Sequence, residues 1–444
     1  MSGMFSLLRC MFLCLVAIPS LRAQTPILVS PSDKLLGVVD TIIISGNNKT
    51  RDYVILDEMT VKPGDTVSEE SLLYDQNRIY GLGLFTRVDI QYDSLPGVRF
   101  LFVDVNERWY IIPFPIFGFR DGDPQRPFYG AGLLHNNVGG KNQKLYASAV
   151  AGNDPSASLS FSDPLFDPEN RLFYSASLSF NRVRNKSEIE AARSGQFDEY
   201  HYGIDATLGK RYTIMQAAAG SVGFRAVDVS PWEPGRTVSP RGKDRYIVAT
   251  LSYAYDSRDL YEYASSGDYL GGFLTKSGFG ESSISFTRFG ADLRHYAPLP
   301  FECTFASRLT GSIVAGGAIP TYEHVYFGYQ EQLRGWYRTV FEGEDLAGIN
   351  LELRRFILSP RVFRVNSLPI PEEFTVWKFG ISVAVFANAG TTWFRGDKLT
   401  WTSIQSGYGA GIHWLLPYSY VMRTEYAWNQ FGQGQFILDF RASI

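Results

Sequence analysis

The chain lacks long apolar runs, although 45% of its 444 residues are hydrophobic and 15% are aromatic. A membrane-spanning helix needs about 20 apolar residues in a row, and no stretch beyond the N-terminus reaches about 18. The mean hydropathy is only −0.10. Alternation of apolar and polar residues along β-strands explains both values, because each strand then has one apolar and one polar face.

Cysteine is scarce and the charges nearly balance. Of the three cysteines, Cys10 and Cys14 lie in an N-terminal segment that we expect to be removed, which leaves Cys303. A lone cysteine forms no internal disulfide. The net charge is −3 at pH 7, so we expect no polybasic surface and no nucleic-acid partner.

Motifs for common catalytic chemistry are absent. The sequence contains no HExxH, paired CxxC, GxSxG or phosphate-binding loop. The five histidines lack the spacing of metal ligands: His135, His201, His295, His324 and His413. We expect no catalytic residue, metal or cofactor; a barrel lipase, with Ser and His brought together in space, is the enzymatic alternative.

Residues 407–411 superficially look like a dinucleotide loop, but they lie in an alternating strand, so we interpret these small residues as easing barrel curvature.

The first 23 residues have the features of a secretory signal peptide. Arg9 supplies the positive charge, residues 10–19 form a short apolar core, and Leu21-Arg22-Ala23 fits a cleavage site. The alternative, a membrane anchor, needs a longer run. Residues 24–36 follow as a polar leader. The chain is therefore expected to be exported, either to a periplasm or to an outer membrane.

Residues 37–108 form a compact unit with the expected order β-α-α-β-β. Strands are predicted at 39–44, 85–90 and 98–105, and helices at 50–59 and 66–80. Thr66 and Glu69 have the spacing of a capping box. The unit resembles a POTRA domain through Ile44-Ser45-Gly46-Asn47, Lys62-Pro63-Gly64-Asp65, Gly83-Leu84-Phe85-Thr86-Arg87-Val88 and Val103-Asp104-Val105-Asn106-Glu107. An unrelated small α+β domain is the alternative.

From residue 109 to residue 444 the sequence alternates, as in 172–180, 247–255 and 436–444. Such alternation is typical of membrane barrels, whose strands face lipid on one side and the lumen on the other. Turn-rich breaks divide the region into 16 strands, near 110–120, 128–136, 142–152, 156–163, 171–184, 196–210, 213–228, 244–257, 266–279, 282–297, 301–317, 347–358, 375–391, 406–416, 418–428 and 434–444. The sequence therefore predicts a 16-stranded antiparallel transmembrane β-barrel preceded by one small α+β domain. A soluble β-sandwich or propeller is the alternative, which the strand ending at Ile444 disfavours.

Between the eleventh and twelfth expected strands, residues 319–346 have no clean period and contain Leu333-Arg334-Gly335-Trp336. Glycine permits a tight turn and arginine pairs with carboxylates, which suits a loop folded back into a barrel. Arg-Gly pairs also occur in ordinary surface turns. By alternation, Glu352 and Asn388 face the lumen, so we expect Arg334 to pair with Glu352 and to hydrogen-bond near Asn388.

Together, the POTRA-like unit, the 16-strand pattern and this loop resemble the BamA/TamA superfamily of outer-membrane assembly and translocation proteins. Further matches are Asp256-Ser257-Arg258-Asp259, Gly267 to Gly272, Ala347-Gly348-Ile349-Asn350 and Phe386-Ala387-Asn388-Ala389-Gly390. The chain departs from the family at three points. Asn388 stands where the family often has Asp, the last residue is Ile444 rather than an aromatic residue, and only one POTRA-like unit is recognised.

The resemblance implies a bacterial outer-membrane protein with its POTRA domain in the periplasm. The implied partners are outer-membrane lipids, unfolded client outer-membrane or exported proteins, and periplasmic chaperones or lipoproteins. Insertion of client barrels and two-partner-type secretion of a soluble protein both remain open, with a passive pore as a third possibility. Secretion pores usually place a plug helix before two POTRA units, and residues 24–36 are too few for it, so insertion is favoured. Residues 84–93 and 98–106 are expected to bind clients by strand addition.

The first barrel strand contains Pro113 and Pro115, which remove two backbone donors from a single edge. Prolines are tolerated at sheet edges, so this edge is expected to face the last strand. At about 0.5–1.5 kcal/mol per hydrogen bond, this seam would lose about 1–3 kcal/mol and be the weakest joint of the barrel. Its expected residues are Pro113, Pro115, Gly118, Phe436, Phe440 and Ile444. The alternative is that the prolines mark a bulge or an unpaired strand end.

Overall fold

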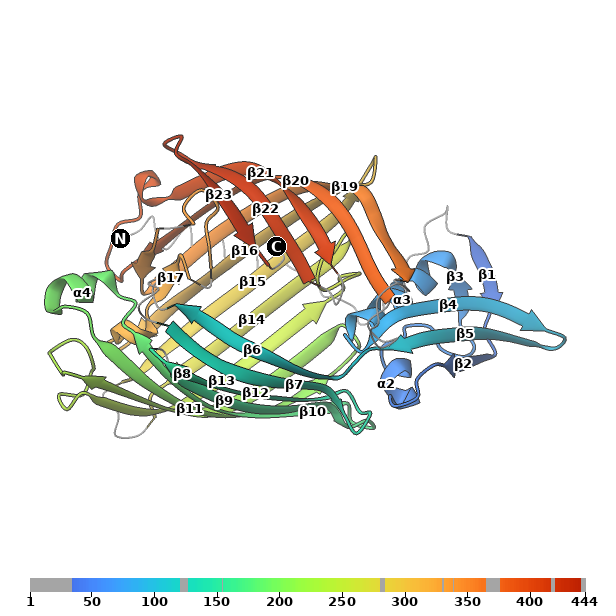
Figure 1. The fold of residues 1–444 in the computed structure, drawn as a ribbon, viewed down its shortest axis with the longest axis horizontal. Coiled ribbons are helices and arrows are strands. Elements are labelled where there is room, and N and C mark those ends of the chain that lie inside the picture. Colours follow the sequence, from blue (N-terminus) through green and yellow to red (C-terminus); the bar gives the residue numbers. More distant parts are fainter. Residues whose placement is uncertain are drawn as a thin grey trace.

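The computed structural model describes residues 34–119, 127–153, 155–279, 284–329, 331–337, 339–364, 376–416 and 420–440. A small N-terminal domain lies at one end of a large barrel (Figure 1). We refer to this as the near end of the barrel and to the opposite end as the far end. The expected signal peptide at 1–23, most of the leader at 24–36, and Ile444 lie outside the described residues.

The N-terminal domain has the predicted helices and strands, with one addition. A three-stranded sheet has the order β2-β5-β4, in which β2 runs parallel to β5. Two short strands that the sequence did not predict, β1 and β3, pair with each other. The elements are β1 (Leu35–Val38), β2 (Thr41–Ser45), α2 (Asp52–Leu56), β3 (Thr66–Ser68), α3 (Glu69–Gly81), β4 (Phe85–Leu95) and β5 (Val98–Glu107).

The capping box of α3 lies two residues later than predicted. The Ser68 hydroxyl accepts the Ser71 backbone N–H at 3.2 Å, and the Ser71 hydroxyl oxygen accepts the Ser68 N–H at 3.0 Å. Thr66 belongs to β3 instead, so the predicted box with Glu69 is wrong. The reason is the pairing of β1 with β3, which keeps Thr66 extended and delays the start of the helix.

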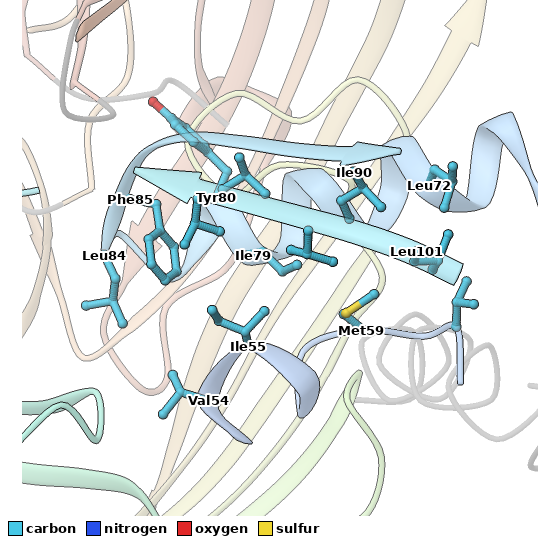
Figure 2. Packing of buried hydrophobic residues seen from close by; sticks show 14 of the residues in the cluster. Val54, Ile55, Met59, Leu72, Ile79, Tyr80, Leu84, Phe85, Ile90 and Leu101 are labelled. Atoms are coloured by element: carbon cyan, nitrogen blue, oxygen red, sulfur yellow. The ribbon is translucent and has the colours of Figure 1, made fainter. Parts of the chain in front are cut away.

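The core of the domain forms where α2 and α3 cover one face of the sheet (Figure 2). Ile55, Ile79, Leu84 and Leu101 are fully buried there. Leu260 belongs to this same core, although it comes from a turn of the barrel about 150 residues further along the chain. The domain therefore shares its apolar interior with the near end of the barrel.

The barrel contains the 16 predicted antiparallel strands within the described residues, which confirms the predicted fold. Each pairs with its sequence neighbour, and β16 pairs with β19 across the long loop. The strands are β6 (Ile111–Phe119), β7 (Pro127–Val138), β8 (Gln143–Gly152), β9 (Ser156–Asp167), β10 (Leu172–Arg184), β11 (Asp198–Arg211), β12 (Gln216–Ser230), β13 (Lys243–Asp256), β14 (Gly267–Ser277), β15 (Phe286–Leu299), β16 (Cys303–Gly316), β19 (Asp345–Arg364), β20 (Val376–Trp393), β21 (Gln405–Leu416), β22 (Tyr420–Asn429) and β23 (Gly434–Asp439).

Side chains along β19 point alternately to the outer face and to the lumen of the barrel. Leu351 and Leu353 are 37% and 42% exposed on the outer face, whereas Glu352 and Arg354 are 1% and 3% exposed on the inner face. No helix in the described part of the chain has the length and apolarity to span a bilayer. A short helix, α4 (Glu188–Ser194), lies in the far-end loop between β10 and β11.

Ion pairs fasten the N-terminal domain to the near end of the barrel. Asp57 and Glu58 follow α2, and two barrel arginines reach them: Arg171 contacts Asp57 at 3.0 Å, and Arg211 contacts Glu58 at 2.8 Å. The buried Arg78 of α3 completes the group at 2.7 Å from Glu58. Burial alone would raise the pKa of Glu58, but Arg211 and Arg78 hold it below its usual value.

We expect Glu58→Gln to destabilise the N-terminal domain, because it leaves Arg78 buried without a carboxylate. Breaking a buried ion pair in this way costs about 3–5 kcal/mol. Urea titration of the full chain in detergent, followed by far-UV circular dichroism, measures the change. Because docking lowers the pKa of Glu58, its contribution is present at neutral pH and is lost as the pH falls through that lowered value.

Glu69→Gln is the matched control, since Glu69 pairs with Lys34 and both side chains are mostly exposed. It should shift the urea midpoint little. Equal midpoints for the two variants would contradict a structural role for the Glu58 pairs.

Candidate functional site

The long loop between β16 and β19 enters the barrel. It contains a short 3-10 turn, η2 (Thr321–Glu323), and a small hairpin of β17 (Val325–Phe327) and β18 (Phe341–Gly343). Leu333 is 1% exposed and packs with Phe327 and Leu346. Glycines on the inner wall make room for the Phe327 ring, because a Cβ at Gly348 or Gly390 would lie 2.9 or 2.7 Å from it.

Arg334 lies at the buried tip of this loop, and two carboxylates of the barrel wall bind its guanidinium. Its Nη1 donates to Glu352 of β19 at 2.9 Å and to Glu425 of β22 at 3.3 Å. The guanidinium carbon also lies 3.7 Å from the centroid of the Phe386 ring on β20. Planar stacking and charge-assisted hydrogen bonds are the contacts that arginine makes best. The loop is thereby bonded to three strands of the wall.

The two carboxylates hold further arginines, so the charges balance. Arg354 Nη1 lies 3.5 Å from Glu352, and Arg423 Nη1 lies 3.1 Å from Glu425. Arg423 also contacts Asp439 of the last strand at 2.6 Å. Three arginines thus face three carboxylates, as a group of buried charges requires. We call these six residues the charge cluster: Arg334, Arg354, Arg423, Glu352, Glu425 and Asp439.

His413 of β21 lies in the middle of the charge cluster and is fully buried. Its Nε2 lies 3.1 Å from Glu425, and its Nδ1 lies 2.9 Å from the Tyr263 hydroxyl. Because a carboxylate can only accept, Nε2 carries the proton; in the neutral ring Nδ1 then accepts from Tyr263. Glu352, His413 and Glu425 bring ligand atoms within 4.8 Å of one another, but arginine side chains already bind both carboxylates.

Two glycines let the loop approach the wall. Gly335 has φ +94°, a conformation that favours glycine, and a Cβ there would lie 2.7 Å from the Trp428 carbonyl oxygen. A Cβ at Gly407 of β21 would lie 1.9 Å from the Arg334 carbonyl oxygen. Gly407 therefore gives space to the loop backbone, a role that the sequence did not predict; its part in barrel curvature stays a prediction.

Trp336 fixes the loop on the other side of Gly335. Its indole N–H donates to the Ser406 carbonyl at 3.0 Å. Its ring packs edge-to-face against Phe341 and Phe431, with 5.4 and 5.7 Å between the ring centroids. A buried indole needs a partner for its N–H. The four predicted loop residues therefore all contact the barrel interior, although their functional role stays a prediction.

Of the two partners predicted for Arg334, Glu352 is confirmed and Asn388 is wrong. The ion pair with Glu352 is present, but Arg334 does not hydrogen-bond to Asn388 among the described residues. Asn388 is 4% exposed, and neither polar atom of its side chain has a hydrogen-bond partner within the described parts. Glu425, on a strand beyond β20, takes the place that we gave to Asn388. The alternation of β22 places Arg423 and Glu425 on the inner face, and this signal could have revealed them.

A second set of contacts ties the loop to the side of the wall that contains β13 and β16. Arg308 of β16 pairs with Glu331 at 2.8 Å, and the Tyr322 hydroxyl donates to Asp244 of β13 at 2.6 Å. Between the loop and this wall lies a cavity of about 810 Å³, lined partly by small residues such as Ala218, Gly272 and Gly311. The loop divides the lumen and leaves this space on one side.

The seam is the second candidate site. β6 and β23 are the ends of the sheet order, and the described residues contain no backbone pairing between them. The Asn136 N–H donates to the Tyr110 carbonyl at 2.9 Å, so Tyr110 and every second residue after it face β7. Pro113 and Pro115 therefore face the outer edge, as the sequence predicted.

The other seam residues divide between the two edges. The Asn429 N–H donates to the Gln433 carbonyl at 3.0 Å, which places Phe436 and Phe440 on the outer edge of the last strand by the same alternation. Gly118 instead faces β7, where a Cβ would lie 2.4 Å from the Phe128 ring. Its backbone groups therefore face away from the seam, although it lies on the seam strand, and its role there stays a prediction. Ile444 lies outside the described residues.

Together these features define a membrane β-barrel with a POTRA-type domain and an arginine-bearing loop in its lumen. The family model of the Omp85 superfamily domain matches residues 137–443, and the POTRA model, a surface antigen variable number repeat, matches residues 38–108. The chain belongs to the Omp85 superfamily, whose relatives indicate an outer-membrane function.

Individual relatives are distant. The chain is 21% identical over 404 residues to the outer membrane protein assembly factor BamA of Nitratidesulfovibrio vulgaris, covering 85% of this chain and 47% of the relative. It thus spans about half the length of that protein. The structure of BamA from Haemophilus ducreyi lacking POTRA domains 1–3 matches with a TM-score of 0.53 and 14% identity, over 91% of this chain and 83% of that one. CdiB from Acinetobacter baumannii matches with a TM-score of 0.49 and 14% identity, over 91% of this chain and 73% of the CdiB chain. These structural matches concern the fold alone.

We expect Gly407→Ala to displace the loop, because the new methyl group would collide with the Arg334 carbonyl. Backbone cannot yield as a flexible side chain can, so Arg334 would move away from Glu352. Trypsin cleavage after Arg334 in the folded barrel reports this movement, and its rate should rise about tenfold or more, the factor for a loss of about 1.4 kcal/mol.

Gly272→Ala on β14 is the control, since the nearest atom to its new Cβ is 3.8 Å away. It should leave the cleavage rate unchanged. If Gly407→Ala also left it unchanged, close packing of the loop against β21 would be refuted.

Proposed function

We propose that this protein inserts or folds client β-barrel proteins in the bacterial outer membrane, and that the client enters at the seam between β6 and β23. The observation that carries the proposal is the outer edge of β6. Pro113 and Pro115 have no N–H to offer there, so the first strand is poorly suited to a permanent partner.

Strand length supports the same conclusion. Within the described residues β23 has six residues and β6 has nine, whereas β20 and β19, three and four strands from β23 in the sheet order, have 18 and 20. Short strands form few hydrogen bonds, and each contributes about 0.5–1.5 kcal/mol. The Phe440 N–H, which points to the outer edge, is bound at 2.8 Å by its own neighbour Asp439. A joint of this kind can exchange partners at low cost.

The edges of the N-terminal sheet are where an unfolded client would bind by strand addition. The sheet order makes β2 and β4 the edges and β5 the centre. Residues 84–93 keep their proposed role, but 98–106 belong to the central strand and cannot accept a partner. The β4–β5 hairpin extends away from the barrel (Figure 1), so the free end of β4 is the accessible part.

Secretion of a soluble protein through the lumen is the alternative function. It requires a path along the barrel axis, where the long loop is bound to β19 and β22 through Arg334 and to β13 through Tyr322. Insertion at the seam needs no such path. The arrangement of the loop therefore favours insertion.

In this proposed function, residues 37–108 form a POTRA domain in the periplasm and residues 109–444 form the barrel in the outer membrane. A signal peptide at 1–23 precedes them. The partners are outer-membrane lipids and unfolded client proteins, with periplasmic chaperones or lipoproteins delivering them. No cofactor or catalytic step is proposed.

Depletion followed by complementation tests the proposal. Cells depleted of the protein should lose other outer-membrane barrels, and the wild-type chain should restore them. Variants with paired cysteines at 116–118 and 436–440 should restore them only under reducing conditions, because the disulfide holds the seam closed. A disulfide between β12 and β13 at the paired positions Ala219 and Ser252 is the control and should have no effect.

Equal complementation by locked and reduced seam variants would exclude entry at the seam. Loss of one soluble exported protein, with the barrels unchanged, would support secretion instead.

A further inference from the structure

The turn between β13 and β14, residues 257–266, contains both Leu260 and Tyr263. It lies at the near end of the barrel, facing the N-terminal domain. Its two halves contact different parts of the molecule. Leu260 is 8% exposed within the core of the N-terminal domain, whereas Tyr263 is 4% exposed within the barrel.

The first half of the turn is bound to the N-terminal domain. Leu260 packs with that domain's buried apolar residues. The Tyr261 ring lies against the end of α3, where a Cβ on Gly81 would be only 2.8 Å from it. Any movement of the domain away from the barrel must therefore break these contacts or carry the turn with it.

The second half of the turn is bound to the charge cluster. The Tyr263 hydroxyl bonds to His413 at 2.9 Å, and its ring lies 3.9 Å from the guanidinium carbon of Arg354. Arg354 also donates to the Ala264 carbonyl. His413 in turn contacts Glu425, and Arg354 contacts Glu352. These two glutamates are the residues that bind Arg334 of the loop.

The turn itself is braced from within. The Asp259 carboxylate accepts the backbone N–H groups of Ser265 and Ser266 at 2.8 and 3.1 Å, and the Asp259 N–H donates to the Ser266 carbonyl at 3.2 Å. These bonds join the start of the turn to its end. A braced turn moves as one piece, so a displacement of Leu260 reaches Tyr263 rather than being absorbed between them.

We propose that this turn couples the N-terminal domain to the inward loop, with Leu260 and Tyr263 as its positioning residues. While the domain is docked, Tyr263 and Ala264 hold His413 and Arg354 where they orient the two glutamates toward Arg334. When the domain swings away, the turn withdraws and the grip on Arg334 weakens. Client capture at the N-terminal domain would thereby release the loop inside the barrel, a consequence that rests on the proposed function.

The coupling is measured without any client, in the purified full chain in lipid nanodiscs. The reporter is Leu333→Cys, in a background whose three native cysteines are replaced by serine, because Leu333 is 1% exposed while the loop is docked. Thiol labelling then reports release of the loop. Leu260→Ala should raise the labelling rate about fivefold or more, the lower range of measured couplings between sites, and Leu260→Met should keep it near the parent rate.

Leu73→Ala is the matched control, because it makes the same substitution in the N-terminal domain at a leucine that is 57% exposed. It should change the rate less than about twofold. Tyr263→Phe should raise the rate by itself, and adding Leu260→Ala to it should have little further effect, since both act through one element.

The proposal is overturned if Leu260→Ala labels at the parent rate, or if Leu260→Ala and Tyr263→Phe act independently and their effects multiply. Trypsin cleavage after Arg334, in chains that keep Leu333, gives the same comparison if the cysteine variant does not fold. Because no client is present, a failed coupling leaves the insertion function standing, and a failed depletion experiment leaves the coupling standing.

Discussion

The bond between Arg334 and the two glutamates of the barrel wall is the interaction on which the interior of this protein depends. Glu352 and Glu425 are each 1% exposed, and two carboxylates so far from water are tolerated only with cations beside them. Arg354 and Arg423 neutralise part of that charge from the wall itself, and the loop supplies the rest. The loop is therefore a structural part of the barrel, and its removal would leave an acidic, unbalanced site.

This requirement explains residues that otherwise have no evident purpose. Gly335 and Gly407 let the loop backbone reach the wall, and Phe386 supplies a flat surface for the guanidinium. The turn at 257–266 reaches the same glutamates from the near end of the barrel through His413 and Arg354. The loop, the wall and the turn all contact the charge cluster. Arg423 connects the cluster to the last strand through its ion pair with Asp439. The charge cluster thus contacts the inward loop, the barrel wall, the near-end turn and the last strand.

Sequence reasoning predicted most of the fold, because alternation within a strand is a local signal. It also found Arg334 and Glu352, since a loop arginine and an inward carboxylate can be recognised separately. It missed Glu425 and His413, which join the site only through the order of neighbouring strands around the barrel. Asn388 was wrong for the same reason: facing the lumen does not place a side chain within reach of Arg334. The role of Gly407 depended on how closely the loop approaches, which no residue pattern records.

A double-mutant cycle between Arg334 and Glu352 tests the central claim most directly. The stability of the folded barrel in detergent, measured by urea titration with heat-modifiable gel mobility, is compared for Arg334→Ala, Glu352→Gln and the double variant. If the pair holds the loop in place, each single change destabilises the barrel, and the double variant is more stable than the sum of the two effects predicts, by about 0.5–3 kcal/mol. Additive effects would show that Arg334 and Glu352 act independently, and would contradict the account.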